Sequence, residues 1–494
     1  MGARLRFDDV IVVLPGILGS VLYRGEEPVW KPPFRLGGAL RGGGRALEDL
    51  AGDHRLLDDP DHDDGVVATG LIGTPVAVPG LAKVNQYRML RRRITQELDV
   101  VVGDSAVDGP PANYFEFPYD WRRDNRVTAA RLKALVDREL PKWATTRPYG
   151  PPPRVVLVCH SMGGLVAKYY LDALGGWERC RALVTFGTPF RGAVDALGFL
   201  ANGARKFGVV FDALSAVAAE FTSVYQLLPR YPVVLDRRAD RPGPPDVLRV
   251  TELDRAPGRL DLKRASAAYE DFHRRMDEDR STHAGRPLTS LVSLVPVVGY
   301  GHGTLQSAVL DDDGLRTTEE PLALDPSQHW LATGDRTVPL LSAVPVELSD
   351  AGTWAWENAT HSSVHATDAV LDRLVRTLGL YGSGLRDLQG AERAAGPPPF
   401  PAGPDADALD LRVEDAYAED EPVVVTCGGL PAGGPVQEPD APRIAFAGPG
   451  QPAAVTLAEE DGHARWTADG LVPGTYELTV TAGNRSVKDV FEVW

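Results

Sequence analysis

The stretch that decides the fold is Val155-Val-Leu-Val-Cys159-His-Ser161-Met-Gly163-Gly. Its β-branched first half predicts a buried strand, and the apolar residues that follow Ser161 recur with helical spacing. Ser161 therefore lies at a strand-to-helix turn, the context of a nucleophile elbow. The residues two before and two after such a serine must be small because the turn is tight. Cys159 and Gly163 occupy these positions, so the pattern is G-x-S-x-G with Cys in place of the first Gly.

Similar β-branched runs lie elsewhere in the chain, each followed by residues with helical spacing, at 10–14, 182–186 and 291–298. Continuous apolar strands of this kind suit a parallel sheet covered by helices on both faces. The last helix is predicted from about Asp368, which can serve as its cap, to Leu378. We therefore predict one α/β domain over residues 1–381.

Two insertions within this domain, at about 25–85 and 196–290, lack the alternation of strand and helix. The first contains the acidic cluster 58–64, interpreted as a solvated loop; binding of a hard cation is the alternative, although the calcium-loop spacing is missing. The second contains an apolar stripe at helical spacing. It predicts either a helix packed on the core or a lid that opens onto lipid. The stripe consists of Val210, Leu214, Val217 and Phe221.

The composition changes after the last predicted helix. Residues 382–406 are rich in Gly and Pro, which predicts a semi-rigid linker and a domain boundary. Residues 407–494 then show short alternating runs broken by turn residues, which predict a small antiparallel, Ig-like β-sandwich. The runs are 422–426, 453–457, 464–467, 475–481 and 487–493. No catalytic cluster is evident there, so we expect an accessory domain, with an unknown protein as its candidate partner.

Composition narrows the possible partners. The 494 residues include 52 Lys and Arg against 68 Asp and Glu, giving a net charge of −16, which argues against nucleic acid. The three cysteines form neither a disulfide framework nor a metal-ligand spacing, and we expect no metal and no cofactor. We find no secretory signal, and the longest apolar run, 288–300, is interrupted and too short to span a membrane. We therefore expect a cytoplasmic protein, with peripheral membrane contact left open.

A serine hydroxyl is a weak nucleophile at neutral pH. It needs a neutral imidazole to take its proton and a carboxylate to orient that imidazole. In this kind of fold the acid and then the base follow the serine along the chain. Asp335 lies in the tight turn 334–339, and His361 and His365 lie in the loop before the last helix. We expect His361 to be the base because it stays free on the loop, whereas His365 lies near the helix start; His365 remains the alternative.

Asp335 and His160 lie in the same motifs, and each has a structural interpretation without a catalytic role. Asp335 considered alone is also compatible with a turn residue that bonds its own backbone. His160 directly precedes Ser161, so its side chain should point away from the serine, and we interpret it as a packing residue.

Acyl transfer also needs donors for the oxyanion, usually two backbone N–H groups, one of them on the residue after the nucleophile. Met162 supplies that one. Ile17 is the second candidate because it lies at the end of the first strand between Gly16 and Gly19, which allow the backbone to turn its amide inward. The alternative of a phosphate-binding loop fails because the lysine of that motif is absent.

Seven motifs occur in the chain in this order: 15–19, 118–122, 159–163, 186–192, 223–229, 334–339 and His361. Together, and in this order, they resemble the lecithin:cholesterol acyltransferase and phospholipid:diacylglycerol acyltransferase family of α/β-hydrolases. The resemblance covers roughly the first 380 residues. It implies an α/β-hydrolase fold and acyl-ester chemistry on lipids, with Ser161, Asp335 and His361 as the triad and Ile17 and Met162 as oxyanion donors. It also implies that Trp30 and residues 196–290 border the substrate site.

The sequence departs from the family pattern in several places. Cys159 replaces the usual Gly of the elbow, and Arg336 replaces the common Gly after the acid. The cysteine-bridged surface loop and the secretion signal of the extracellular members are missing. A sterol acceptor and a lipoprotein setting therefore do not follow from the resemblance.

We therefore expect a serine-dependent lipid acyl hydrolase or O-acyltransferase, similar to a phospholipase or to lecithin:cholesterol acyltransferase. It would act on a lipid ester, with presentation at a membrane or micelle surface left open. Two alternatives remain. One is a soluble esterase or thioesterase of the same fold, and the other is an inert hydrolase-like protein that recruits partners.

Overall fold

A computed structural model describes most of the chain. The predicted linker 382–406 lies outside the described residues except for Gly382. The described residues are 4–31, 45–53, 57–59, 64–78, 81–85, 87–203, 209–240, 245–279, 286–322, 324, 331–348, 355–382, 408–430, 441–460 and 463–493.

A six-stranded sheet forms the centre of the fold. Every neighbouring pair of its strands is parallel, which confirms the predicted α/β class. All residues of three of its four inner strands, β2, β10 and β11, are buried, as expected for a sheet with both faces covered. Its order is β17 (Ala355–Glu357), β14 (Ser293–Gly299), β11 (Cys180–Phe186), β10 (Val155–His160), β2 (Val10–Leu14) and β9 (Tyr114–Glu116).

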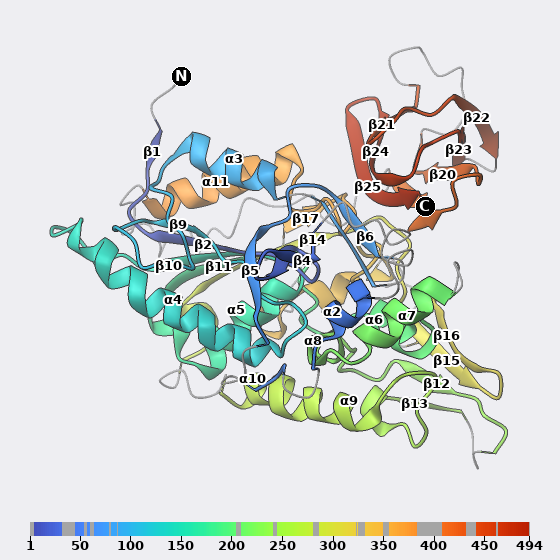
Figure 1. The fold of residues 1–494 in the computed structure, drawn as a ribbon, viewed down its shortest axis with the longest axis horizontal. Coiled ribbons are helices and arrows are strands. Elements are labelled where there is room, and N and C mark those ends of the chain that lie inside the picture. The colour runs from blue at the N-terminus through green and yellow to red at the C-terminus, as the bar shows by residue number, and fades with distance from the viewer. Residues whose placement is uncertain are drawn as a thin grey trace.

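Helices cover both faces of this sheet. Helices α3 (Arg88–Glu97) and α11 (Asp368–Gly382) lie together on one face, and α4 (Asn125–Thr145) and α5 (Met162–Ala173) lie on the other (Figure 1). Helix α5 starts directly after β10 and packs on β10 and β11. The central strand and the helix that follows it therefore have the arrangement that a nucleophile elbow requires. No helix in the described part of the chain is long and apolar enough to cross a membrane.

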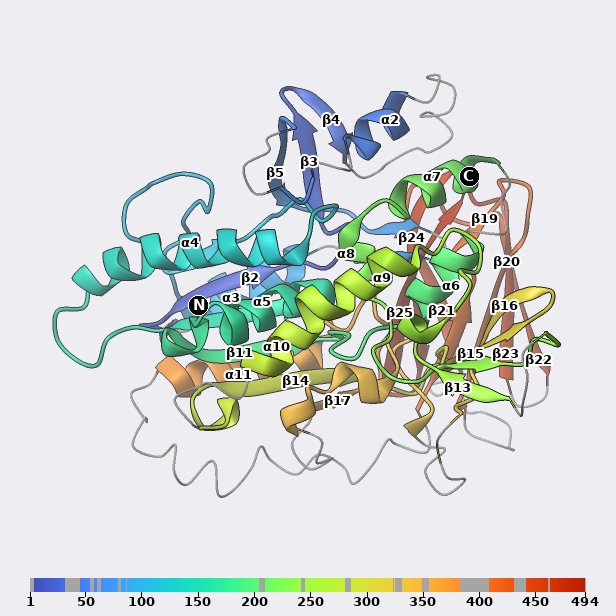
Figure 2. The same ribbon diagram turned by 90° about the horizontal axis from the view of Figure 1, so that it is seen from below.

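The first insertion contains more regular structure than expected. Strand β3 (Ser20–Arg24) pairs with β4 (Glu27–Trp30) and β5 (Val66–Leu71), and β6 (Val76–Val78) pairs with β7 (Ala82–Val84). Helix α2 (Arg45–Ala51) lies beside this small sheet, beyond α4 (Figure 2). These short antiparallel strands do not alternate with helices, so the α/β pattern did not reveal them. Strands β1 (Leu5–Arg6) and β8 (Leu98–Asp99) form a further two-stranded pair.

The second insertion is mainly helical. Two of its strands, β12 and β13, pair with the later strands β15 and β16 in a small sheet, in the order β13, β12, β15 and β16. Its helices are α6 (Val194–Asn202), α7 (Val209–Ala218), α8 (Thr222–Tyr225), α9 (Leu262–Ala268), a π-helix (Tyr269–Arg274) and α10 (Arg275–Asp279). The small sheet consists of Asp246–Leu248, Val234–Asp236, Ser307–Asp311 and Gly314–Thr318, and the 3-10 turns are Gly176–Glu178, Val250–Glu252, Leu288–Ser290, Leu340–Ala343 and Val346–Leu348.

The apolar stripe of α7 packs inward in this structure. Leu214 and Phe221 are buried in the main hydrophobic core, and Val217 packs against it half-buried. The side chain of Val210 lies outside the described residues. The arrangement favours the first of the two alternatives, a helix packed on the core.

Residues 408–493, called the C-terminal β module below, form two four-stranded sheets around a hydrophobic cluster of their own, which includes Trp466, Tyr476 and Phe491. All pairings are antiparallel except that of β19 with β25. One sheet consists of β18 (Asp410–Val413), β20 (Val423–Gly428), β23 (His463–Asp469) and β22 (Ala454–Glu460); the other consists of β19 (Ala416–Tyr417), β25 (Arg485–Val493), β24 (Gly474–Ala482) and β21 (Arg443–Ala447).

The C-terminal β module contacts the rest of the chain through polar groups. Strand β25 lies against β6 and β7. The amide of Asn358 bonds the backbone of Leu409 in both directions, at 3.0 Å for each bond. Nδ1 of the buried His302 accepts the N–H of Leu411 at 3.3 Å. Docking of the module thus depends on a neutral imidazole.

This contact predicts a pH-dependent stability. Burial lowers the pKa of His302 to about 4 in the folded chain. In the unfolded chain the same imidazole is protonated at about pH 6.5. The stabilisation is full above pH 6.5 and is lost as the pH falls towards 4. Between pH 7 and pH 5 we expect this residue to lower the free energy of unfolding by about 2 kcal/mol. Denaturant titrations at several pH values measure the free energy of unfolding of the wild type and of His302→Asn, whose side chain does not titrate in this range. The contribution of His302 is the difference between their pH dependences, and equal pH dependences would contradict the prediction.

Candidate active site

The backbone at Ser161 is strained in the way a nucleophile elbow requires. Ser161 has φ 50° and ψ −126°, a conformation that costs about 1–3 kcal/mol for a residue with a side chain. Its N–H donates to the carbonyl of Phe186 at 2.9 Å, and the hydroxyl of Thr188 donates to its carbonyl at 2.9 Å. The end of strand β11 therefore holds the turn from both sides.

Two glycines leave the space that the site needs. A Cβ on Gly163 would lie 2.4 Å from the carbonyl oxygen of Pro15, so the loop after β2 can approach α5 only because the side chain is absent. Gly187 has φ 56°, and a Cβ there would lie 2.7 Å from Oδ2 of Asp335. Cys159, by contrast, is accommodated in the buried strand β10.

Ser161, His361 and Asp335 form one line of hydrogen bonds. Nε2 of His361 lies 2.9 Å from Oγ of Ser161, and Nδ1 lies 2.7 Å from Oδ2 of Asp335. Since the carboxylate only accepts, Nδ1 carries the proton and Nε2 is free to accept the serine proton. The other oxygen of Asp335 accepts the N–H groups of Thr337 and Val338, at 3.1 and 2.7 Å. The turn that carries the acid thus fixes its orientation.

The structure distinguishes the three histidines. His361 bonds the serine, whereas the ring of His365 packs against the rings of His160 and Tyr87, with centroids 4.4 and 4.8 Å apart. His160 is buried and its ring packs against those of His361 and His365, as the interpretation as a packing residue expects. Its two ring nitrogens both form hydrogen bonds, to Tyr87 and to the backbone of His361.

His160 belongs to a chain of bonds that links the loop after β2 to the base. The backbone carbonyl of His361 accepts from Nε2 of His160 at 3.0 Å, which leaves Nδ1 to accept the hydroxyl of Tyr87 at 2.9 Å. The oxygen of Tyr87 in turn accepts the N–H of Gly16 at 2.9 Å. Burial, with the nearby rings of His365 and His361, lowers the pKa of His160 well below its usual range. A neutral ring is the form that this chain requires.

The two candidate oxyanion donors lie on elements that meet at Ser161. Met162 is the first residue of α5, where helix N–H groups have no partner within the helix. Ile17 is buried in the loop after β2, next to Leu18, which has φ 63°. A Cβ on Gly16 would lie 3.4 Å from Oγ of Ser161, so this loop passes close to the nucleophile.

Trp30 bonds to the same loop. Its indole donates to the carbonyl of Leu18 at 3.0 Å and its ring meets Trp121 edge-on at 5.4 Å. Tyr119 donates its hydroxyl to the carbonyl of Pro15 at 2.8 Å. The motif 118–122 thus holds the loop in place, and Trp30 is a fully buried part of that support.

The side chains of the three residues are almost completely buried. The exposed fractions of Ser161, His361 and Asp335 are 5%, 3% and 1%. A cavity of about 210 Å³ adjoins the acid and base. Two of its lining residues, Asp415 and Asp489, come from the C-terminal β module.

In the described part of the acidic cluster 58–64, Asp59 is exposed, as expected for a solvated loop, whereas Asp58 and Asp64 make structural contacts. Asp58 accepts the N–H of Asp124 at 2.9 Å and the hydroxyl of Thr222. Asp64 pairs with the buried guanidinium of Arg122 at 2.8 Å. Neither carboxylate matches the solvated loop that we expected. Residues 60–63 lie outside the described part.

The elbow, the parallel sheet and the chain order Ser161, Asp335, His361 match the arrangement of the α/β-hydrolases. Residues 106–258 match the model of the lecithin:cholesterol acyltransferase family, which confirms the resemblance inferred from the motifs. No curated protein matches the chain.

Several solved structures are similar to parts of the chain or to most of it. The lipase BlEst2 of Bacillus licheniformis in its mature form aligns over 76% of this chain and 94% of its own, at 11% identity and a TM-score of 0.32. Its propeptide form aligns over 99% and 95%, at 12% identity and a TM-score of 0.33. The M1 domain from titin aligns over 16% and 82%, at 14% identity and a TM-score of 0.12.

The close approach at Gly163 predicts an asymmetry within the elbow motif. Gly163→Ala should abolish activity, because the new Cβ would push the loop after β2 away from Ser161. Cys159→Ala should retain activity within about threefold, because a smaller residue fits the buried strand without strain. Ester hydrolysis assays of both variants, with circular dichroism as the control for folding, measure the difference. Equal activities would contradict it.

The hydroxyl of Tyr87 predicts a combined effect on stability and turnover. Tyr87→Phe leaves the N–H of Gly16 and Nδ1 of His160 without their partner, at a cost of about 1–3 kcal/mol of unfolding free energy. Turnover should fall as well, because Gly16 precedes a candidate oxyanion donor. Tyr170→Phe, on the second half of α5, is the matched control. Chemical denaturation and kcat measure both effects, and a Tyr87→Phe protein equal to the control would refute this role.

Proposed function

We propose that the protein is a serine-dependent lipid acyl hydrolase or O-acyltransferase that works through an acyl-enzyme. One observation carries the proposal: the imidazole of His361 lies 2.9 Å from the oxygen of Ser161 and 2.7 Å from that of Asp335. This distance is within the reach that a general base needs. The match of residues 106–258 to the lecithin:cholesterol acyltransferase family supports a lipid ester as the substrate class.

In the first step Oγ of Ser161 attacks the ester carbonyl carbon while Nε2 of His361 takes the hydroxyl proton. The carbonyl electron pair moves onto the oxygen, and the N–H groups of Met162 and Ile17 are the proposed donors to that oxyanion. Asp335 accepts Nδ1–H throughout and stabilises the imidazolium. When the tetrahedral intermediate collapses, the ester C–O bond breaks and the leaving alcohol takes the proton from Nε2.

In the second step an acceptor attacks the acyl-enzyme by the reverse path. His361 takes the proton of water or of an alcohol, the new C–O bond forms, and Ser161 leaves with the proton restored. Water gives a free fatty acid and an alcohol gives a new ester. The balance between them depends on how well the closed site excludes water.

The burial of the three side chains affects how the substrate arrives. Since Ser161 is 5% exposed, a lipid ester reaches it only when neighbouring segments move. We therefore propose that aggregated lipid, at a micelle or membrane surface, is a better substrate than dissolved short-chain ester. Equal turnover of the two forms would favour a soluble esterase or thioesterase.

Replacement of the nucleophile tests the proposal. Ser161→Ala should lower kcat on lipid esters by on the order of 10⁴ without unfolding the chain, because it removes the hydroxyl that lies 2.9 Å from Nε2 of His361. The wild type should react with a fluorophosphonate probe and the variant should not. Thermal melting controls for folding.

The substrate panel should contain mixed phospholipids with and without diacylglycerol or sterol, since the products separate hydrolysis from transfer. A folded Ser161→Ala protein with full activity would overturn the mechanism. An unlabelled and inactive wild type would favour the inert, partner-recruiting alternative.

A further inference from the structure

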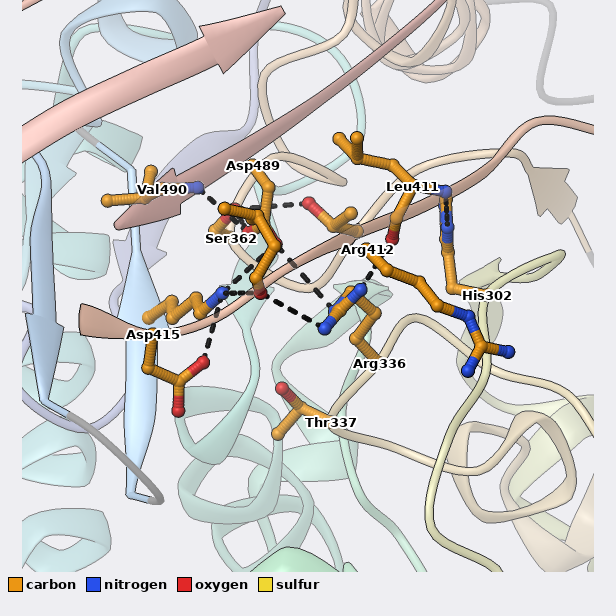
Figure 3. A network of polar contacts seen from close by, with 12 residues as sticks. His302, Arg336, Thr337, Ser362, Leu411, Arg412, Asp415, Asp489 and Val490 are labelled. Carbon is orange, nitrogen blue, oxygen red and sulfur yellow. Dashed lines mark hydrogen bonds and ion pairs between the residues drawn. The ribbon is translucent and has the colours of Figure 1, made fainter. Parts of the chain in front are cut away.

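The residues that directly follow the acid and the base both bond to the C-terminal β module. Arg336 follows Asp335, and Ser362 follows His361. Both side chains reach the module, and both contact Asp489 (Figure 3). The module is therefore attached at the two loops on which the proposed chemistry depends.

Arg336 adopts a backbone conformation that a glycine would adopt more easily. Its φ is 80°, in the left-handed region that is unfavourable for residues with a side chain. Its guanidinium donates to the carbonyl of Leu411 at 2.5 Å and to that of Val413 at 3.2 Å, both on β18. The strain is thus offset by charge-assisted bonds that only the side chain provides.

Asp489 on β25 is the centre of the second attachment. It is 1% exposed and accepts the hydroxyl of Ser362 at 3.1 Å. Lys83 lies 3.1 Å from Asp489 and 3.0 Å from Asp415, and Nε of Arg336 lies 3.8 Å from Asp489, so both cations contribute to the compensating charge. A buried carboxylate of this kind costs several kcal/mol if its partners are removed.

The loop around His361 has further bonds to the same strand. The hydroxyls of Thr360 and Ser363 both donate to the carbonyl of Lys488, the latter at 3.1 Å. The loop 358–367 forms turns without a regular helix or strand. Side-chain bonds from both sides of His361 therefore add to the few backbone bonds that fix its position.

A small displacement of His361 is enough to reduce turnover. The proton transfer proposed above requires Nε2 of His361 to stay within hydrogen-bond reach of Oγ of Ser161. A displacement of about 1 Å in such a site reduces rates on the order of 100-fold. Groups that set the position of the loop therefore influence turnover without touching the substrate.

We propose that the C-terminal β module is a working part of the catalytic unit, and that Arg336 and Asp489 are positioning residues that hold the acid and the base against Ser161. The inference rests on the proposed function and extends it to a part of the chain that carries no catalytic group. It also explains why Arg occupies a position whose conformation suits Gly.

The experiment uses the full chain and measures kcat and KM separately. Arg336→Gly relieves the backbone strain but removes both bonds to β18, and Asp489→Ala removes the acceptor of Ser362. For both we expect kcat to fall on the order of 10- to 100-fold with KM unchanged within about twofold. Asp489→Asn, whose amide oxygen still accepts from Ser362, should recover a large part of that loss.

Arg412→Gln is the matched control. It removes half-exposed ion pairs with Glu319 and Asp410 but keeps the backbone carbonyls of β18 that accept from Arg336, so kcat should stay within about twofold. If Asp489→Ala does not fold, Ser362→Ala removes the same bond from the opposite side and should lower kcat several-fold.

The outcomes separate the inference from the proposed function. Folded Arg336→Gly and Asp489→Ala proteins with wild-type kcat would overturn the inference. An increased kcat would overturn it too, because the module would then be a cover that restrains access. Failure of the proposed function appears differently, as a wild type without turnover that depends on Ser161.

Discussion

The hydrogen bond between Nε2 of His361 and Oγ of Ser161 joins residues 200 positions apart in the chain, and the surrounding structure maintains it. Strand β11 fixes the serine through the carbonyl of Phe186, and the turn after Asp335 fixes the acid. The base lies on a loop without regular structure, where its backbone N–H donates to the carbonyl of Asp335 at 2.7 Å and side-chain bonds add to this contact. These come from His160 on one side and from the C-terminal β module on the other.

Backbone strain is concentrated at the same place. In the described part of the chain, the residues other than glycine with positive φ are Leu18, Ser161 and Arg336. Each is either a proposed catalytic group or the neighbour of one. Conformations of this kind persist only where the surroundings determine them. Here the determining contacts are the indole of Trp30 for Leu18, the hydroxyl of Thr188 for Ser161 and strand β18 for Arg336.

The sequence predicted the parts of the fold that have a strong local pattern. The long apolar strands, the elbow and the chain order of the three side chains fall into this group, and the structure brings those side chains together. Edge strands β9 and β17 have three residues each, too few to show a period. The roles of Tyr87 and Asp489 have no local signal, because their partners lie 73 and 127 positions away. The hydrogen bonds of the His160 ring have no local signal either, because their partners Tyr87 and His361 lie 73 and 201 positions away.

The central claim is a covalent one: Ser161 carries the acyl group between donor and acceptor. Mass spectrometry of the full chain, quenched in acid during turnover of a lipid ester, tests it most directly. The account predicts a mass increase equal to one acyl group, located on the peptide that contains Ser161 and absent from the Ser161→Ala protein. Two results would contradict it. One is turnover without such an adduct under conditions in which deacylation is slow, and the other is an adduct on another residue.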